Sequence, residues 1–380
     1  MVQTRGRAHS MGGRARISHQ QLICAAFITK VAAATLYLPT AMVKLGRNGG
    51  WVAPLVAIAL GALPASLLVG TLVRRHPGYS PGEMATQLLG NWAARLFTLL
   101  LALYSLYVSV LAMRDVTEFI PTAILPATPT LAISLTFMLA VVYGAYSGAE
   151  VISRLAVVST ILLLSGLALV GVTVIGLIQP LNLLPVADRG LGQVLSASWP
   201  PIGFFAECWA LFPFVGMLDK GQTAVRGLVL GAVVGGVYLA IETALVSAVF
   251  GVDFAETFTF SGYTLTQQVS IGEFVERLDI ILVNFWMISM VAKLSIHFWT
   301  AVTGASYTLG LKNERILLLP LGAILIAWTE YRPDITSHMD FSIHMWPYIS
   351  LGFSIGLPGL LLVASWVRAH RSRTRSGMGA

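Results

Sequence analysis

Ten apolar stretches, each long enough to cross a lipid bilayer, fill the sequence from about residue 20 to residue 367. The hydrocarbon core of a bilayer is ~30 Å thick, so a helix needs ~20 apolar residues to cross it. The mean hydropathy is +0.78 and only 11% of the residues are charged, which is not the composition of a soluble domain. The sequence therefore predicts an all-α integral membrane protein with ten transmembrane helices.

The polar ends of the spans give the expected helix boundaries. We predict helices at residues 19–45, 50–73, 92–120, 130–147, 149–178, 194–217, 224–250, 278–308, 314–330 and 341–367. Residues 1–18 are predicted to be a disordered basic tail, and residues 368–380 a second basic tail.

The links between the spans differ in charge on the two sides of the membrane. The side of the N-terminal tail carries the basic C-terminal tail and Arg74, Arg75, Arg95, Arg154, Lys220, Arg226, Lys312 and Arg315, whereas the opposite side carries Lys44, Arg47, Arg114, Arg189, Arg277 and Arg332. Because cytoplasmic links are enriched in Lys and Arg, both termini are predicted to be cytoplasmic. We therefore attribute the net charge of +7 to Lys and Arg residues that orient the protein against membrane lipid, and we predict no nucleic-acid partner.

The links on the opposite side are longer and carry most of the acidic residues. These are Asp115, Glu118, Asp188, Asp253, Glu256, Glu273, Glu276, Asp334 and Asp340. The longest link, at about residues 251–276, alternates aromatic and polar residues and is predicted to hold short interfacial helices. Such helices would form either a lid at the membrane surface or a contact surface for a partner.

Two spans have the composition of interrupted helices. The first contains ITKVAAATLYLP from Ile28 to Pro39, with Lys30 deep in the membrane, and the sixth contains IGFFAECWALFP from Ile202 to Pro213, with Glu207. A single proline in a transmembrane helix usually means only a kink. When the two prolines are aligned, however, the two interrupted segments fall at equivalent positions of two sets of five helices. Each segment lies in the first helix of its set.

Interrupted segments at equivalent positions indicate an inverted-repeat transporter fold, because unwound backbone offers free N–H and C=O groups to a bound solute. We therefore predict a 5+5 inverted repeat with broken first and sixth helices. Residues 19–367 would form a single ten-helix domain, with repeats at about residues 19–178 and 194–367.

Three segments of the sequence carry a family resemblance. They are ISHQQLICAAFITKVAAATLYLPTAMVKLGRNGGWVAPLVA, GFFAECWALFPFV and, most specifically, GEFVERLDIILVNFWMISMVAKLSIHFW. These segments resemble the endospore-germination permease family, the B subunits of nutrient germinant receptors, which is similar to amino-acid permeases of the APC superfamily. The resemblance implies a LeuT/APC-like fold and a solute pocket between the first, third, sixth and eighth helices. It also implies assembly with an A subunit and a lipoprotein C subunit in the inner membrane of a spore.

The sequence departs from the superfamily at the first break. Small glycines usually mark this break, and Ala32, Ala33 and Ala34 stand there instead. Alanine favours helix over glycine by ~1 kcal/mol, so we expect a shallower break.

Five ionisable residues lie within the predicted spans, namely Lys30, Glu207, Glu242, Lys293 and His297. A charge at the bilayer centre costs ~2.5 kcal/mol or more, so such residues suggest function. Where superfamily members bind sodium between the first and eighth helices, the resemblance suggests that the ammonium of Lys30 or Lys293 takes its place. Near Glu207, such a lysine could couple solute binding to proton movement. The alternative is a static ion pair that only fixes helix packing.

A zwitterionic amino acid would suit this pocket. Its carboxylate could accept hydrogen bonds from backbone amides of the first break, and its ammonium could meet Glu207. The predicted ligand-binding residues are Ala32, Ala33, Ala34, Thr35, Tyr104, Phe204, Phe205, Glu207 and Trp209.

Three classes of function were weighed. The sequence has no H-E-x-x-H, Walker or G-x-S-x-G motif and no acid pair at a plausible spacing, so no enzyme, cofactor or metal site is predicted. A ligand-sensing receptor subunit and an autonomous proton-coupled amino-acid transporter need the same pocket. The family resemblance favours the receptor.

Overall fold

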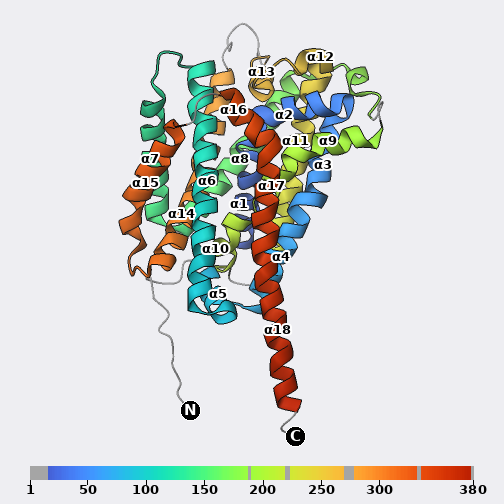
Figure 1. Ribbon diagram of the computed structural model, residues 1–380. Helices are drawn as coiled ribbons and strands as arrows, with labels where there is room; N and C mark the ends of the chain where they lie inside the picture. The colour runs from blue at the N-terminus through green and yellow to red at the C-terminus, as the bar shows by residue number, and fades with distance from the viewer. Residues whose placement is uncertain (1–15, 187–189, 219–222, 269–277, 332–334, 378–380) are drawn as a thin grey trace.

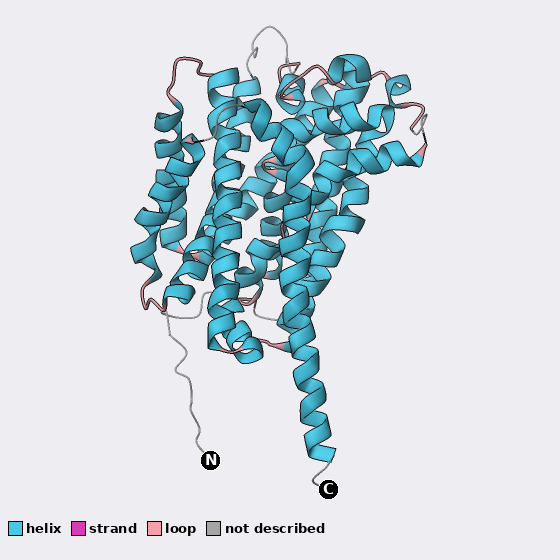
Figure 2. Ribbon diagram, viewed as in Figure 1, coloured by secondary structure: helices cyan, strands magenta, loops and turns pink. Residues whose placement is uncertain are grey.

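The computed structural model describes residues 16–186, 190–218, 223–268, 278–331 and 335–377. Within these ranges all regular structure is helical except for one isolated bridge between Ile17 and Leu218 (Figure 2). Eight charged residues that the sequence analysis assigned to links lie outside the described part of the chain. They are Asp188, Arg189, Lys220, Glu273, Glu276, Arg277, Arg332 and Asp334.

The first half of the chain contains an interrupted helix followed by four further spans. In order, these are α1 (His19–Val31) and α2 (Ala34–Gly46); a second span built from α3 (Ala53–Ala57), a π turn and α4 (Leu63–Arg75); α6 (Asn91–Ala123); α7 (Thr130–Ser147); and α8 (Ala149–Thr173). The short helix α5 (Pro81–Leu89) connects the second and third spans.

The second half repeats the plan. It comprises the interrupted α9 (Leu191–Phe205) and α10 (Phe212–Val215); α11 (Ala224–Phe250); α14 (Leu278–Leu309); α15 (Leu318–Glu330); and a last span of α16 (Ile335–Asp340), α17 (Trp346–Leu351) and α18 (Leu357–Gly377) joined by π turns. Two short helices, α12 (Val252–Ala255) and α13 (Ser261–Thr266), confirm the prediction for the long link.

Seven described helices are long and apolar enough to cross a membrane. The broken first and sixth segments and the 13-residue α15 are shorter than this criterion requires. The helical, multi-pass fold is therefore as predicted, while the count of ten spans stays a prediction.

The surface of the bundle is apolar where lipid would cover it. Large side chains on different outer helices are widely exposed, including Leu139, Ile161, Val172, Leu319 and Val363. Their exposed fractions are 61% or more. In water such a surface would drive aggregation, whereas hydrocarbon solvates it without cost.

The bundle has two distinct ends (Figure 1). Helices α12 and α13 cap one end, and α5 and the end of α18 lie at the other. The start of α1 is held where the backbone N–H of Ile17 donates to the carbonyl of Met217 over 3.1 Å, just beyond α10. Ile17 is buried and Ser18 caps α1, so the chain is held against the bundle from these residues onward.

Two expectations require correction. Asp115 and Glu118 were assigned to a link but lie inside α6, where Asp115 bonds His338 over 2.8 Å and Glu118 pairs with Arg114 over 2.5 Å. These partners compensate the carboxylates, so burial within the helix is tolerated. At the C-terminus, α18 continues as helix to Gly377 through most of the predicted tail.

The close packing of α1 against α11 depends on a glycine. A Cβ at Gly231 would lie 2.4 Å from the carbonyl oxygen of Ile23 and 2.6 Å from the Cβ of Ala26. Gly231→Ala is therefore expected to lower the thermal unfolding temperature in detergent, with a cost of ~1–3 kcal/mol for overpacking. Gly171→Ala is the matched control, because a Cβ there has its nearest neighbour at 3.9 Å. Equal unfolding temperatures for the two variants would contradict this account.

Candidate functional site

The first helix breaks at Ala32 and Ala33, between α1 and α2. Both residues keep right-handed helical torsions, and the N–H of Ala32 still bonds the carbonyl of Ile28 over 3.1 Å. The break is therefore a shallow kink, as the alanines predicted.

The sixth helix breaks more deeply. After α9 ends at Phe205, residues 206–208 form a turn, and a 3-10 turn at residues 209–211 leads into α10. Each break begins seven residues before its proline, Pro39 or Pro213. The alignment of the two interrupted helices made from the sequence therefore holds in the structure.

Side chains of the eighth helix, α14, satisfy the backbone carbonyls around the first break. The ammonium of Lys293 donates to the carbonyl of Thr29 over 2.8 Å, and the indole N–H of Trp286 donates to the carbonyl of Ala32 over 2.7 Å. A buried carbonyl without a partner costs ~1–3 kcal/mol, so these two donors stabilise the interruption.

The second break is supported in the same way. Thr300 of α14 donates to the carbonyl of Ala210 over 2.8 Å, and Ser350 of α17 donates to that of Gly203 over 2.7 Å. Helix α14 therefore holds both breaks, with help from the last span at the second.

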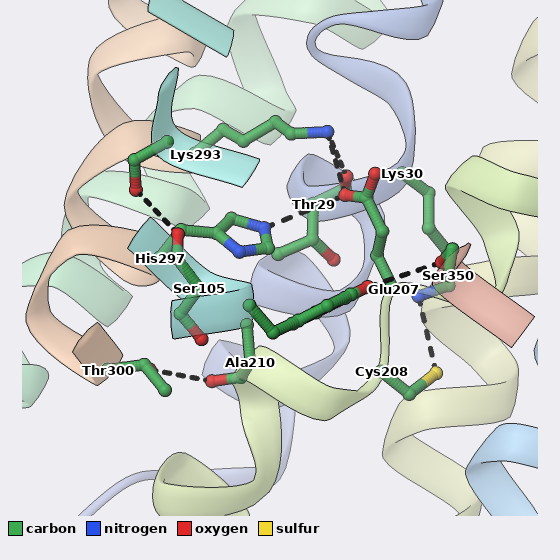
Figure 3. A network of polar contacts seen from close by, with 12 residues as sticks. Thr29, Lys30, Ser105, Glu207, Cys208, Ala210, Lys293, His297, Thr300 and Ser350 are labelled. Atoms are coloured by element: carbon green, nitrogen blue, oxygen red, sulfur yellow. Dashed lines mark hydrogen bonds and ion pairs between the residues drawn. The ribbon is translucent and has the colours of Figure 1, made fainter. Parts of the chain in front are cut away.

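Glu207 lies in the second break and forms a fully buried ion pair with Lys293 (Figure 3). Lys293 Nζ is 2.9 Å from Glu207 Oε2, and Trp346 Nε1 donates to Glu207 Oε1 over 3.1 Å. His297 Nε2 is 3.6 Å from the same Oε2. Lys293 and His297 are four residues apart and so share one face of α14, and that face is turned toward Glu207.

Lys30 occupies a neighbouring position with a different partner. Its ammonium is 3.5 Å from the sulfur of Cys208, which is itself 3.4 Å from the hydroxyl of Ser66. Of the two lysines considered from the sequence, Lys293 is the one that bridges Glu207 and the backbone of the first helix.

A small cavity of about 240 Å³ of empty space adjoins this ion pair. Its lining comes from the first, third, sixth, eighth and last spans and comprises Ala33, Tyr37, Val108, Leu111, Ala112, Asp115, Phe204, Glu207, Lys293, Ser342 and Trp346. Phe204 also places its ring 5.3 Å from Lys293 Nζ. The two breaks, the buried ion pair and this cavity together form the candidate site.

The remaining predicted residues surround the cavity or lie apart from it. Tyr104 stacks on Trp346 at 5.7 Å between ring centroids, and Trp209 packs edge-on against Phe97. Phe205, Ala32 and Ala34 are fully buried beside the breaks, and Thr35 bonds Glu242 in another part of the bundle. Ala33, Phe204, Glu207 and Lys293 are thus the predicted residues that line the cavity.

The sequence did not predict that the last span contributes residues to the site. It contributes Trp346 and Ser342, together with His338, which holds Asp115. The sequence offered a weak signal, a tryptophan followed by Pro347 in the middle of an apolar span. Aromatic residues in such spans usually serve packing, so composition did not mark this one.

The hydrogen bond from Trp346 can be tested without emptying the site. Trp346→Phe keeps a ring against Tyr104 but removes the donor to Glu207. Hydrogen bonds to charged groups contribute ~1.5–3 kcal/mol, so solute affinity should fall by roughly tenfold or more. The measurement is a ligand titration followed by thermal shift, with Trp328→Phe as a control away from Glu207. Similar affinities for both variants would show that the indole N–H is not used.

A family model described as "Spore germination protein" matches residues 16–333. The chain belongs to this spore germination permease family. Among its relatives, spore germination protein KB of Bacillus subtilis (strain 168) is 28% identical, with 95% of this chain and 98% of that protein covered. Spore germination protein YndE of the same organism is 26% identical, with 88% and 92% covered.

Solved transporter structures have the same fold. MhsT in complex with L-phenylalanine superposes with a TM-score of 0.62 at 18% identity, covering 92% of this chain and 90% of that chain. The nucleobase-cation-symport transporter Mhp1, in a closed conformation with bromovinylhydantoin bound, superposes with a TM-score of 0.52 at 14% identity, covering 93% and 80%. At these identities the likeness establishes the fold, which is the predicted LeuT/APC-like one.

Proposed function

We propose that this spore germination permease is the membrane subunit of a nutrient germinant receptor, and that it binds an amino acid at the two helix breaks to trigger germination. The observation that carries the proposal is the buried Glu207–Lys293 pair, which lies beside a cavity between both interrupted helices. Family membership supports the role in germination, and the fold it shares with MhsT, a protein solved with L-phenylalanine bound, supports a small solute.

A zwitterion matches the charges of this site. The ammonium of an amino acid can pair with Glu207, while its carboxylate can pair with Lys293 and with free N–H groups at the start of α2, where the helix dipole favours an anion. Because the solute brings one charge of each sign, the net charge of the buried site stays unchanged. A purely anionic or cationic solute would leave one buried charge uncompensated, which is costly.

Binding requires the ion pair to separate. Glu207 and Lys293 are in direct contact at 2.9 Å, so no solute group fits between them while the pair is closed. A solute that inserts between them would therefore move α14 relative to the second break, since each group belongs to one of these segments. This displacement is the proposed signal to the rest of a receptor.

The proposed setting follows the family. The subunit would lie in the inner membrane of the cell or spore with both termini cytoplasmic, and would assemble with A and C receptor subunits. The alternation of basic links supports this orientation. In this proposal the ammonium of Lys293, which bonds the carbonyl of Thr29, takes the place of the cation that superfamily members bind between the first and eighth helices.

A screen for stabilising ligands tests the proposal directly. Purified protein is heated in the presence of each common amino acid, sugar or nucleoside, because a ligand at 100 times its Kd stabilises the folded state by ~2.7 kcal/mol. We expect a raised unfolding temperature with one or a few amino acids. Stabilisation by sugars or nucleosides alone would contradict the proposed solute class.

An autonomous proton-coupled amino-acid transporter is the alternative, and the transporter fold favours it. Vesicles containing this chain alone, supplied with a radiolabelled amino acid and a pH gradient, separate the two functions. A receptor subunit is expected to bind without accumulation. Strong proton-dependent accumulation would establish the transporter instead.

A further inference from the structure

A second and larger cavity lies on the α13 side of the bundle, apart from Glu207. It has about 610 Å³ of empty space, including space open to its mouth, and its lining includes Thr35, Phe119, Leu167, Glu242, Tyr263 and Trp286. Helix α13 forms part of its wall and lies at the end of the bundle opposite the end of α18 (Figure 1). Under the predicted orientation, this is the outer half of the membrane.

One carboxyl group stands in this otherwise apolar wall. Glu242 of α11 is 6% exposed, and its Oε1 accepts a hydrogen bond from the hydroxyl of Thr35 over 2.6 Å. Its Oε2 is buried and has no hydrogen-bond partner among the described residues. Of the residues that the structure describes, no lysine, arginine or histidine lines the cavity. The carboxyl group thus has an unused acceptor oxygen and no cationic side chain among the cavity walls.

Aromatic rings line the same space. Phe119 packs edge-on against Trp286 at 4.9 Å and against Tyr263 at 5.2 Å between ring centroids, and all three residues contribute to the wall. The faces of aromatic rings carry negative potential and attract cations. The carboxyl group and the rings together favour a positively charged ligand in this cavity and disfavour a negatively charged one.

We propose that this cavity is a second ligand site, which binds a small organic cation consisting of a primary amine on a compact apolar or aromatic body. The ammonium pairs with the carboxyl group of Glu242, and the body lies against the leucines and aromatic rings. This ligand differs in charge from the zwitterion proposed for the central site. Its binding does not depend on which solute occupies the pocket at Glu207.

The two cavities are lined partly by the same helices, but by different charged residues. Trp286 lines the larger cavity while its indole N–H holds the carbonyl of Ala32 at the first break, and Thr35 lies on α2 just beyond that break. Glu207 and Lys293 line only the smaller cavity. A cation at Glu242 would therefore contact α2 and Trp286, which holds the first break, without competing for the central ion pair.

The test uses 2-phenylethylamine as the probe, with 2-phenylethanol and 3-phenylpropanoate as neutral and anionic analogues of similar shape. Binding to the purified full-length protein is measured by calorimetric titration. We expect saturable binding of the amine and at least tenfold weaker binding of both analogues. Glu242→Gln should weaken amine binding by tenfold or more, while Glu207→Gln should leave it unchanged. The exposed Glu150→Gln controls for charge alone.

A second variant keeps the test decisive if Glu242→Gln does not fold. Leu167→Phe adds bulk to the wall of the cavity and leaves the carboxyl group in place, so it should also abolish amine binding. The proposal is overturned if the neutral alcohol binds as tightly as the amine, or if neither Glu242→Gln nor Leu167→Phe weakens binding. It is equally overturned if Glu207→Gln is the variant that removes binding, because the amine would then occupy the central pocket.

Discussion

Replacing Glu207 with glutamine is expected to abolish the response to solute. The substitution removes the charge that would pair with the solute ammonium, and truncating one partner of a buried charge pair costs ~2–5 kcal/mol in binding. This corresponds to an affinity loss on the order of 100-fold. The measurement is a thermal-shift titration with the amino acid found in the screen, together with germination of spores that carry the variant. A normal dose dependence would defeat the assignment.

The folded state of this variant is expected to persist. Glutamine keeps one acceptor oxygen, which can still accept from either Lys293 or Trp346, the two donors that now bond different oxygens of the carboxylate. A double variant, Glu207→Gln with Lys293→Met, removes the unpaired ammonium and provides the control for folding. Because a buried ion pair can often be replaced by neutral groups without loss of stability, this protein should fold and still not respond. A normal response in the double variant would reduce the pair to a packing role.

Replacing Lys293 with methionine is expected to have the next largest effect. The ammonium bonds both the carbonyl of Thr29 and Glu207, so its loss leaves a carbonyl and a buried carboxylate without their donor. Methionine keeps the length and volume of the side chain, so packing changes little. We expect solute affinity to fall by ~100-fold and folding stability by ~3–5 kcal/mol, as for other broken buried pairs.

Sodium provides a specific readout for Lys293. If its ammonium takes the place of a metal cation between α1 and α14, the variant should lose its sodium-independent response, and added sodium should restore part of it. Lys312→Met is the matched control, since this lysine is an exposed residue just beyond the end of α14. An unchanged sodium-independent response in Lys293→Met would refute the role of the ammonium.

The positions of the helix breaks could be predicted from local sequence. Pro39 and Pro213 cannot continue a regular hydrogen-bond ladder, and the small residues before Pro39 and the charge of Glu207 mark where backbone is freed. The shallow first break could also be predicted locally, because alanine favours the helical conformation more than glycine does. These features depend on residues close together in the chain.

The partners of the buried charges could not be predicted in this way. Two lysines were equally suitable for Glu207, and only the packing of α14 against both breaks assigns Lys293 to it and leaves Lys30 with Cys208. The contribution of Trp346 was missed because the last span meets the sixth only in the folded bundle. Likewise, the pairing of Asp115 with His338 joins two residues far apart in sequence.

The sequence by itself determined that this protein is a helical membrane protein, where its two helices are interrupted and which charges lie inside the membrane. These properties follow from the hydropathy of each segment and from its proline, glycine and alanine residues. Each of these influences the structure over only a few residues. Only the tertiary structure decided which of those charges meet, that Trp346 completes the site and that Glu242 lies in a separate aromatic cavity. Such contacts depend on the relative rotation and depth of helices far apart in sequence, which no local pattern specifies.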